Sequence, residues 1–189
     1  MAIEEPKYKI ASKNMNFEIR EYTEILVAET EVEGPFSQAG SSGFRLLADY
    51  IFGNNQSKTK MEMNAPVSQA PSEKIEMTAP VTLTAKNDKY LIQFTLPAIY
   101  RLETAPIPND GRVKIKALSQ RKMAVHTYSG SWSEETYSKE LSIFRRALLD
   151  AGLKTTGEPI FARFNSPFSL WFLRRNEIWF ELDSSIATP

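Results

Sequence analysis

The sequence predicts an α+β fold in which a duplicated unit forms a distorted, open antiparallel β-barrel with two packed helices. Three observations lead to this prediction: an internal repeat at a fixed offset, several segments with the period of strands, and two with the period of helices. The repeated positions are 17–20 and 113–116, Ala28 and Ala124, and Gly34 and Gly130. A match at constant offset indicates duplication of one supersecondary unit. We therefore expect one domain over residues 1–189, with internal halves at about 8–104 and 112–183.

In the first half a strand is followed by a helix. Residues 25–32 alternate with period two, as a half-exposed strand does, until Gly34 and Pro35 interrupt the pattern. Four apolar side chains then recur with the spacing of one helix face. They are Phe44, Leu47, Ala48 and Ile51. Gly53 and Asn54 supply the signal that ends this helix.

The second half repeats this order. Ser129 and Gly130 break a strand, and Ser131 with Glu134 forms a possible capping box at the start of a helix. The apolar stripe of that helix consists of Tyr137, Leu141, Phe144 and Leu148, and Gly152 ends it. Further strands are predicted at 90–96, 160–164 and 178–182, where apolar residues alternate. Many half-buried strands with two helices favour a curved antiparallel sheet.

The composition excludes several classes of function. The 23 Lys and Arg residues balance the 23 Asp and Glu residues, whereas nucleic-acid binders usually have a basic excess. The chain has no cysteine, which excludes disulfides, thiolate metal sites and a cysteine nucleophile. The sequence contains no run of 18 apolar residues, so no membrane span is predicted. The first residues lack the features of a signal peptide, so we expect a cytoplasmic protein, or a periplasmic one if a targeting segment has been removed.

A second, shorter repeat lies between the first helix and the strand at 90–96. Residues 60–68, KMEMNAPVS, recur as residues 74–82, KIEMTAPVT. Methionine and isoleucine alternate around a glutamate in each copy, and the residue before proline is forced into an extended conformation. We therefore predict that each copy is a strand that ends at the rim of the sheet.

Three segments resemble the SOUL haem-binding family. Residues 74–81, KIEMTAPV, look like its hallmark segment, and residues 42–54, SGFRLLADYIFGN, are similar to its first helix. Residues 165–167 followed by 174–179 look like its C-terminal segment. The resemblance runs from about residue 6 to residue 182. It implies a duplicated α+β unit that binds haem and free porphyrins, and an architecture similar to the effector-binding domains of bacterial regulators.

The resemblance implies a haem or tetrapyrrole carrier or buffer, and we expect it to act as a monomer. The balanced charge predicts that it binds no nucleic acid. Haem needs an apolar slot, cations for its propionates and, if iron is ligated, an axial donor. The candidate slot residues are Phe44, Leu47, Ala48, Ile51, Met61, Met63 and Met77, and the candidate propionate partners are Arg45 and Lys60. An apolar helix stripe and methionines are also typical of a packed core.

His126 is the one histidine and hence a candidate iron ligand. Some members of the family are thought to use a histidine before the first helix, and this chain has none there. We therefore expect hydrophobic enclosure of haem without a strong axial protein ligand.

Two alternatives stay open. One is an enzyme acting on a bulky hydrophobic or tetrapyrrole ligand, with Glu62 and Glu76 as a carboxylate pair, although no catalytic motif is found. The other is a small-molecule sensor domain. We expect a binding protein rather than an enzyme.

Overall fold

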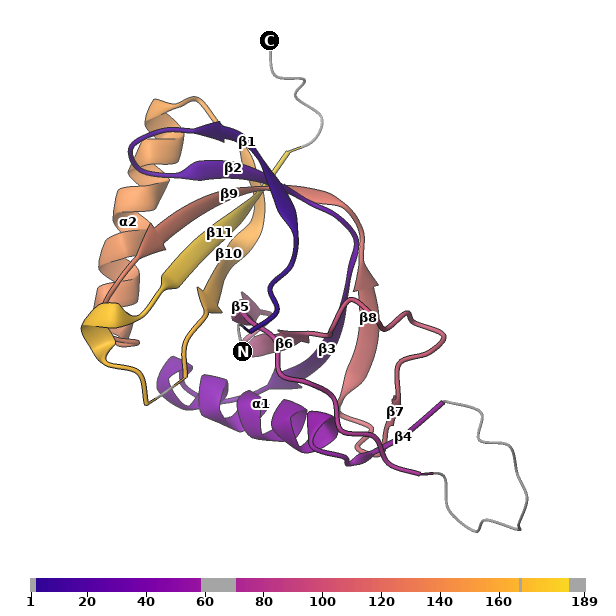
Figure 1. Cartoon of the computed structure of the whole chain (residues 1–189). Helices are drawn as coiled ribbons and strands as arrows, with labels where there is room; N and C mark the ends of the chain where they lie inside the picture. The colour runs from indigo at the N-terminus through magenta and orange to yellow at the C-terminus, as the bar shows by residue number, and fades with distance from the viewer. Residues whose placement is uncertain (1–2, 59–70, 167, 184–189) are drawn as a thin grey trace, which may run out of the picture.

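Nine strands form one strongly curled antiparallel sheet, flanked by two long helices (Figure 1). The structure is a computed structural model and describes residues 3–58, 71–166 and 168–183. In chain order the elements are β1 (Tyr8–Lys13), β2 (Glu18–Tyr22), β3 (Ile25–Val32), α1 (Phe36–Ile51), β4 (Asn55–Gln56), β5 (Val81–Lys86), β6 (Lys89–Thr95), β7 (Ile107–Pro108), β8 (Lys114–Leu118), β9 (Arg121–Tyr128), α2 (Glu134–Asp150), β10 (Thr155–Arg163), the 3₁₀ helix η1 (Trp171–Leu173) and β11 (Asn176–Leu182). The predicted α+β class with two packed helices is confirmed.

The strand order exchanges strands between the two halves of the chain. The large sheet runs β1-β2-β9-β11-β10-β5-β6-β3-β8, and β4 pairs separately with β7. Outward from the central β10–β5 pair, the order is β11, β9, β2 on one side and β6, β3, β8 on the other. Strand β2 thus pairs with β9, and β8 pairs with β3. Corresponding strands of the two halves thus occupy matching positions on either side of the central pair, as expected for a duplicated unit. Duplication itself stays a prediction.

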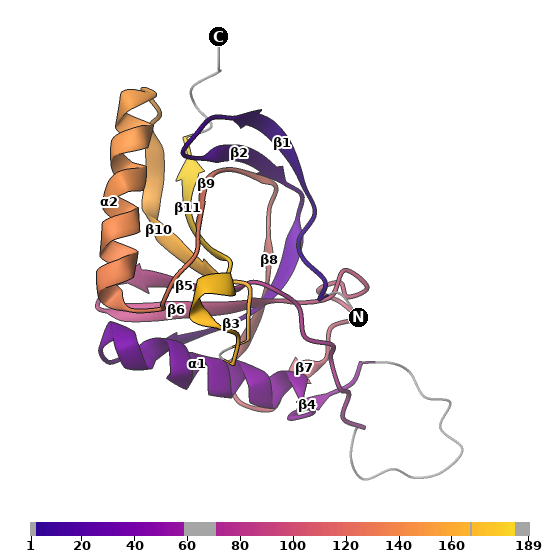
Figure 2. The same ribbon diagram turned by 60° about the vertical axis from the view of Figure 1, so that its left-hand side comes forward.

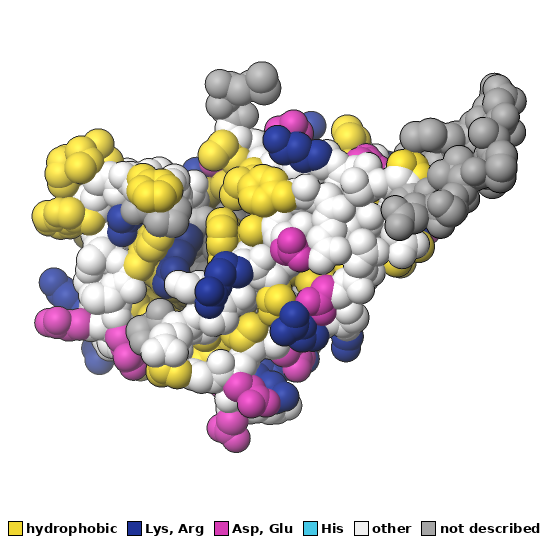
Figure 3. Space-filling view, turned by 90° about the horizontal axis from the view of Figure 1, so that it is seen from below, with side chains coloured by type: hydrophobic (Ala, Val, Ile, Leu, Met, Phe, Trp, Pro, Cys, Tyr) yellow, Lys and Arg dark blue, Asp and Glu magenta, His cyan; other side chains and the backbone are white. Residues whose placement is uncertain are grey.

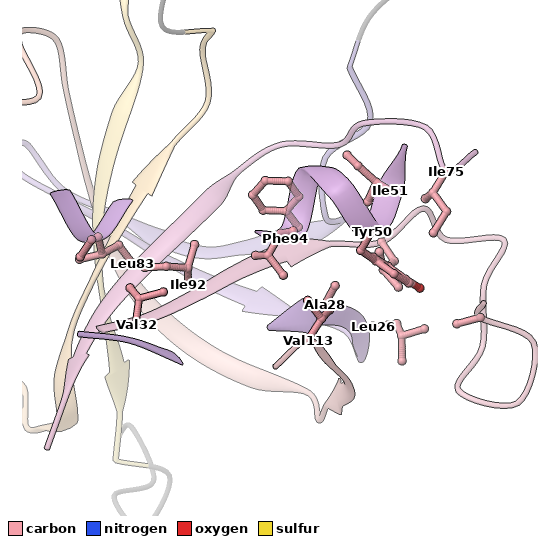
Figure 4. Packing of buried hydrophobic residues seen from close by; sticks show 14 residues of the cluster. Leu26, Ala28, Val32, Tyr50, Ile51, Ile75, Leu83, Ile92, Phe94 and Val113 are labelled. Atoms are coloured by element: carbon pink, nitrogen blue, oxygen red, sulfur yellow. The ribbon is translucent and has the colours of Figure 1, made fainter. Parts of the chain in front are cut away.

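Both helices lie on the outer face of the curled sheet, and the N-terminal residues lie inside the curl (Figures 1 and 2). Below β3 and β6, α1 packs through a cluster that includes Leu47, Tyr50, Ile51 and Ile92, shown in Figure 4. The Tyr50 hydroxyl donates to the carbonyl of Pro106 at 2.9 Å. Full burial of such large apolar side chains stabilises the fold by about 1.5–3 kcal/mol each. In the described chain, neither helix has the length and apolarity needed to cross a membrane.

A glycine allows α1 to lie unusually close to the sheet. A Cβ atom on Gly43 would lie 2.2 Å from Cγ1 and 2.8 Å from Cβ of Ile92, far inside van der Waals contact. Only a residue without a side chain can occupy this helix position at the observed spacing.

The helix α2 packs against β9, β10 and β11 through Phe144 and Leu148. The predicted stripe of this helix is therefore where we expected it, but the predicted cap is two residues too early. Ser133 is the N-cap, and its hydroxyl accepts a bond from the Thr136 amide at 3.2 Å. Ser131 instead exchanges hydroxyl bonds with Ser133 and Thr136.

The strand predicted at residues 74–82 is wrong for most of its length. Residues 71–77 have no regular structure, Thr78 forms an isolated bridge with Glu4, and β5 begins only at Val81. The apolar residue Ile75 packs against the end of α1 rather than in the sheet, where its amide donates to the Ile51 carbonyl. The first copy of the repeat, residues 60–68, lies outside the described residues.

The inner face of β11 contains a buried carboxylate. Glu177 has no exposed surface, and its two oxygens lie 3.1 Å from Nη1 of Arg20 on β2. It also accepts bonds from the Trp179 indole at 2.7 Å and from Arg175 at 2.9 Å. Burial lowers the pKa of the Arg20 guanidinium, but the charge of Glu177 and the contacts with Tyr22 and Glu18 together outweigh burial and raise it. Side chains from β2 and β11 are thereby linked across β9.

Buried and half-buried tyrosines should make the fold sensitive to alkali. Burial raises the pKa of Tyr22, Tyr100 and Tyr137 to about 12 each, and Glu73 adds to the shift at Tyr100. An unfolded chain loses its phenolic protons near pH 10. Between these two values the folded state binds more protons, so the free energy of unfolding falls as the pH rises.

We expect cooperative unfolding between about pH 10 and 12, with tyrosinate absorbance and loss of circular dichroism rising together. Burial lowers the pKa values of Arg121 and Arg163, so these two groups make the free energy of unfolding rise with pH. They are fewer than the tyrosines, whose effect has the opposite sign. Tyrosine ionisation near pH 10 with the secondary structure intact would contradict this expectation.

Candidate functional site

A cleft of about 620 Å³ opens on the outer face of the sheet, beside the first half of α1. Its floor consists of apolar residues of β5 and β6, and its walls come from α1, from the β9–α2 connection and from the end of β10. The lining residues are Gly40, Ser41, Phe44, Arg45, Val81, Leu83, Ile92, Trp132, Arg163 and Asn165. In Figure 3 the face that carries α1 is hollowed, and Lys or Arg side chains lie in and around the hollow. Pockets of 300–1,000 Å³ with apolar walls and few polar groups are typical ligand sites.

Arg163 is the main polar group of the cleft. It lies on the outer face of β10, paired with Val81, and no carboxylate contacts it within the described residues. Its Nε atom is buried and has no hydrogen-bond partner among the described residues. Burial, together with the nearby charge of Arg174, lowers the pKa of Arg163 to about 10. A guanidinium held in this way is able to accept an anionic ligand, because such a ligand would supply the missing partner.

Two neighbours hold the Arg163 side chain in place. Its Cζ atom lies 4.7 Å from the centre of the Trp132 ring, and Arg174 lies against the same ring at 4.2 Å. On the α1 side, a Cβ atom at Gly40 would be 3.2 Å from Nη1 of Arg163. Trp132 also donates from its indole to Asn176 at 2.7 Å, which fixes the ring plane. The cleft therefore has a positioned aromatic wall beside a positioned cation.

The predicted slot residues are divided between cleft and core. Phe44 and Arg45 line the cleft. Leu47, Ala48 and Ile51 are buried against the sheet and do not line it. Met77 does not line the cleft. It lies in the irregular segment before β5 and is 41% exposed. The candidates Lys60, Met61 and Met63 lie outside the described residues.

His126 lies under α2, and both ring nitrogens have protein partners. Nδ1 is 2.6 Å from the Asn16 carbonyl oxygen, and Nε2 is 3.0 Å from Oε2 of Glu140. The imidazole is buried and does not line the cleft. Ligation of iron by this histidine would require both hydrogen bonds to be rearranged.

The proposed carboxylate pair receives no support from geometry. Glu76 is exposed in the irregular segment before β5, and Glu62 lies outside the described residues.

Sequence reasoning missed Arg163 and Trp132. A signal for Arg163 was present, because in the strand predicted at 160–164 it shares a face with Phe161 and is the one charge there. Trp132 aligns with Phe36 in the internal repeat but stands in a connection, where periodicity gives no information about burial.

A second hollow of about 450 Å³ lies between the N-terminal residues and the segment after β6. Its lining includes Glu4, Glu5, Glu24 and Glu103, against Lys7 and Arg101. This excess of carboxylates is unsuitable for a dianionic ligand, so the α1 cleft is the better candidate site.

The α1 cleft fits a tetrapyrrole in two of the three features that haem needs. It has apolar walls and cations, Arg163 and Arg45, that can pair with propionates. Its described lining contains no histidine, methionine, tyrosine or cysteine that could serve as an axial ligand.

Comparisons with known proteins show the family and the fold of the chain. Heme-binding protein 2 of Mus musculus is 27% identical over 185 residues, covering 94% of this chain and 85% of the relative. The Homo sapiens protein of the same name is 27% identical over 167 residues, covering 87% and 77%. The solved EcmrR C-terminal domain has the same fold, with a TM-score of 0.62, 12% identity and coverage of 93% and 98%. The family described as SOUL heme-binding protein matches residues 3–181, so this chain belongs to the SOUL heme-binding family.

Proposed function

We propose that this protein binds haem or a related tetrapyrrole in the α1 cleft, and that it acts as a carrier or buffer. The observation that supports the site most strongly is Arg163, a half-buried arginine without a carboxylate partner among the described residues, whose Nε atom is buried without a hydrogen-bond partner at the end of an apolar cleft. Membership of the SOUL family supports the ligand class. A propionate group would give Arg163 the counter-charge that the protein does not provide.

We further propose that binding depends on enclosure rather than on a strong axial ligand. Phe44, Leu83 and Trp132 provide apolar and aromatic surface for the faces of a macrocycle, with Arg45 at the rim as a second partner for carboxylates. The cleft lining has no iron donor in the described residues, and His126 is already hydrogen-bonded elsewhere. Such a site distinguishes poorly between haem and metal-free protoporphyrin, because the shared ring and carboxylates supply the contacts.

Arg163→Met is expected to weaken haem and protoporphyrin binding by about 10- to 100-fold, because a hydrogen bond to a charged group is worth roughly 1.5–3 kcal/mol. Protoporphyrin dimethyl ester, which lacks the carboxylates, should bind the variant and the wild type equally. The free protein should become more stable by about 1 kcal/mol, since a half-buried charge without a carboxylate partner among the described residues is removed. Absorbance titration and quenching of tryptophan fluorescence measure the affinities for the porphyrins and for the ester. Urea unfolding measures the stability.

Arg112→Met is a matched control, because that side chain is exposed and paired with Asp110 away from the cleft lining. His126→Ala tests ligation: haem binding should survive, whereas selective loss of haem with protoporphyrin retained would make His126 the axial ligand. Equal haem affinity of Arg163→Met and wild type would place the ligand outside the α1 cleft. No saturable binding of any porphyrin would refute the proposed function.

A further inference from the structure

The connection between β10 and β11 exposes a group of large apolar side chains. They are Phe168, Leu170, Trp171, Phe172 and Leu173, here called the η1 cluster. Phe168 is 96% exposed, and the other four are between 53% and 66% exposed. Single exposed apolar residues are common, but a contiguous group marks a surface that meets another apolar phase or partner.

The cluster is held in shape by the backbone beneath it. The Ser169 amide donates to the Ser166 carbonyl, and the Leu173 amide donates to the Leu170 carbonyl, both at 3.0 Å. Trp171 and Phe172 meet edge to face with ring centres 5.6 Å apart. At the base, Nε of Arg174 donates to the Ser169 carbonyl at 3.0 Å. The apolar side chains are therefore presented on hydrogen-bonded turns.

Two arginines adjoin the cluster. Between residues 164 and 175 the sequence contains Arg174 and Arg175 and no aspartate or glutamate. Arg175 forms ion pairs with Glu5 and Glu177, whereas Arg174 directly follows the cluster. Arg174 lies against the Trp132 ring, and so does Arg163 in the cleft. Apolar residues of the Trp, Phe and Leu type beside Arg or Lys are the composition that binds the interface of anionic membranes.

We propose that the η1 cluster inserts into the interfacial region of an anionic lipid membrane. The aromatic and leucine side chains of the cluster suit the boundary between headgroups and acyl chains, where tryptophan is enriched. The positive charge of Arg174 behind them complements anionic phosphates, and the connection itself contains no acidic residue that would repel them. Asn165, at the start of this connection, lines the α1 cleft. If the cleft takes a tetrapyrrole, as proposed above, its mouth would then adjoin the bilayer in which such apolar molecules dissolve.

The test is sedimentation of the full chain with vesicles of roughly two parts phosphatidylcholine to one part phosphatidylglycerol, compared with phosphatidylcholine alone. We expect binding to the anionic vesicles that weakens as salt is added. Trp171→Ser combined with Phe172→Ser should lower the partition coefficient by roughly tenfold or more, because two interfacial anchors are lost. Quenching by brominated lipid should decrease in the same variant.

Leu149→Ser is the matched control, because Leu149 is 71% exposed at the C-terminal end of α2 and the η1 cluster adjoins the other end (Figure 1). It should bind vesicles like the wild type. Haem titration without vesicles should be unchanged in the double variant, so failure of membrane binding and failure of tetrapyrrole binding are separate results. Absence of vesicle binding by the wild type would overturn the proposal. So would self-association that the double variant abolishes, because the cluster would then join copies of the chain.

Discussion

Gly43→Ala is expected to lower the free energy of unfolding by about 3 kcal/mol, the upper part of the usual range for overpacking. The added methyl group would lie 2.2 Å from Cγ1 of Ile92 and 2.8 Å from its Cβ. A rotation of the Ile92 side chain moves Cγ1 but leaves Cβ in place. Helix α1 must therefore move away from β6, and Phe44 and Arg45 would move with it. Urea unfolding should show the loss of stability, and porphyrin titration should show weaker binding.

Gly40→Ala is the control three residues earlier in the same helix. The new Cβ would lie 3.2 Å from Nη1 at the end of the Arg163 side chain and 3.7 Å from Cδ1 of Leu83, which is an ordinary contact distance. Replacing a helical glycine by alanine gains up to about 1 kcal/mol of helix propensity. The two substitutions are thus expected to change stability in opposite directions. If both substitutions lower the free energy of unfolding by the same amount, the close approach of α1 to β6 is not the reason for glycine at position 43.

Glu177→Leu is expected to destabilise the fold by about 3–5 kcal/mol, because it leaves a buried guanidinium without its main partner. Arg20 has only 4% of its surface exposed and would keep Glu18, at 2.8 Å, as its remaining carboxylate. The Trp179 indole would lose its acceptor as well. Urea unfolding monitored by tryptophan fluorescence measures the effect.

The double variant Arg20→Met with Glu177→Leu should recover most of this loss, because removal of both charges leaves neither one uncompensated. Glu177→Gln, which keeps the shape and an acceptor oxygen, should fall between the wild type and Glu177→Leu. Additive losses in the double variant would show that the two side chains stabilise the fold independently rather than as a pair.

The class of fold was predictable because periodicity is a local property. The apolar stripe of Phe44, Leu47 and Ile51 predicted the second half of α1, and the structure buries Leu47 and Ile51 against the sheet. The first half of that helix was not predicted, since residues 37–43 are mainly serine and glycine, which are poor helix formers. Packing of Ala39 in the core and the close approach at Gly43 outweigh that propensity.

The candidate site was predictable only in part, because strand pairing brings together residues that are far apart in the chain. Phe44 and Arg45 were identified from the helix motif, and they do line the cleft. Arg163 and Trp132 join them only because β10 pairs with β5 and the start of α2 adjoins the end of β10. No pattern within a single segment contains that information.

The exchange of strands between halves has a consequence for synthesis of the chain. Strand β3 receives its edge partner β8 only after residue 118 has been made, and β2 waits for β9, which ends at Tyr128. A nascent chain that contains the first half alone therefore presents open strand edges, and such edges tend to pair with those of other chains. The strands β10 and β11, which join β5 to β9, end only at Arg163 and Leu182. Ribosome-bound intermediates of this protein should therefore need shielding until nearly the whole polypeptide has emerged.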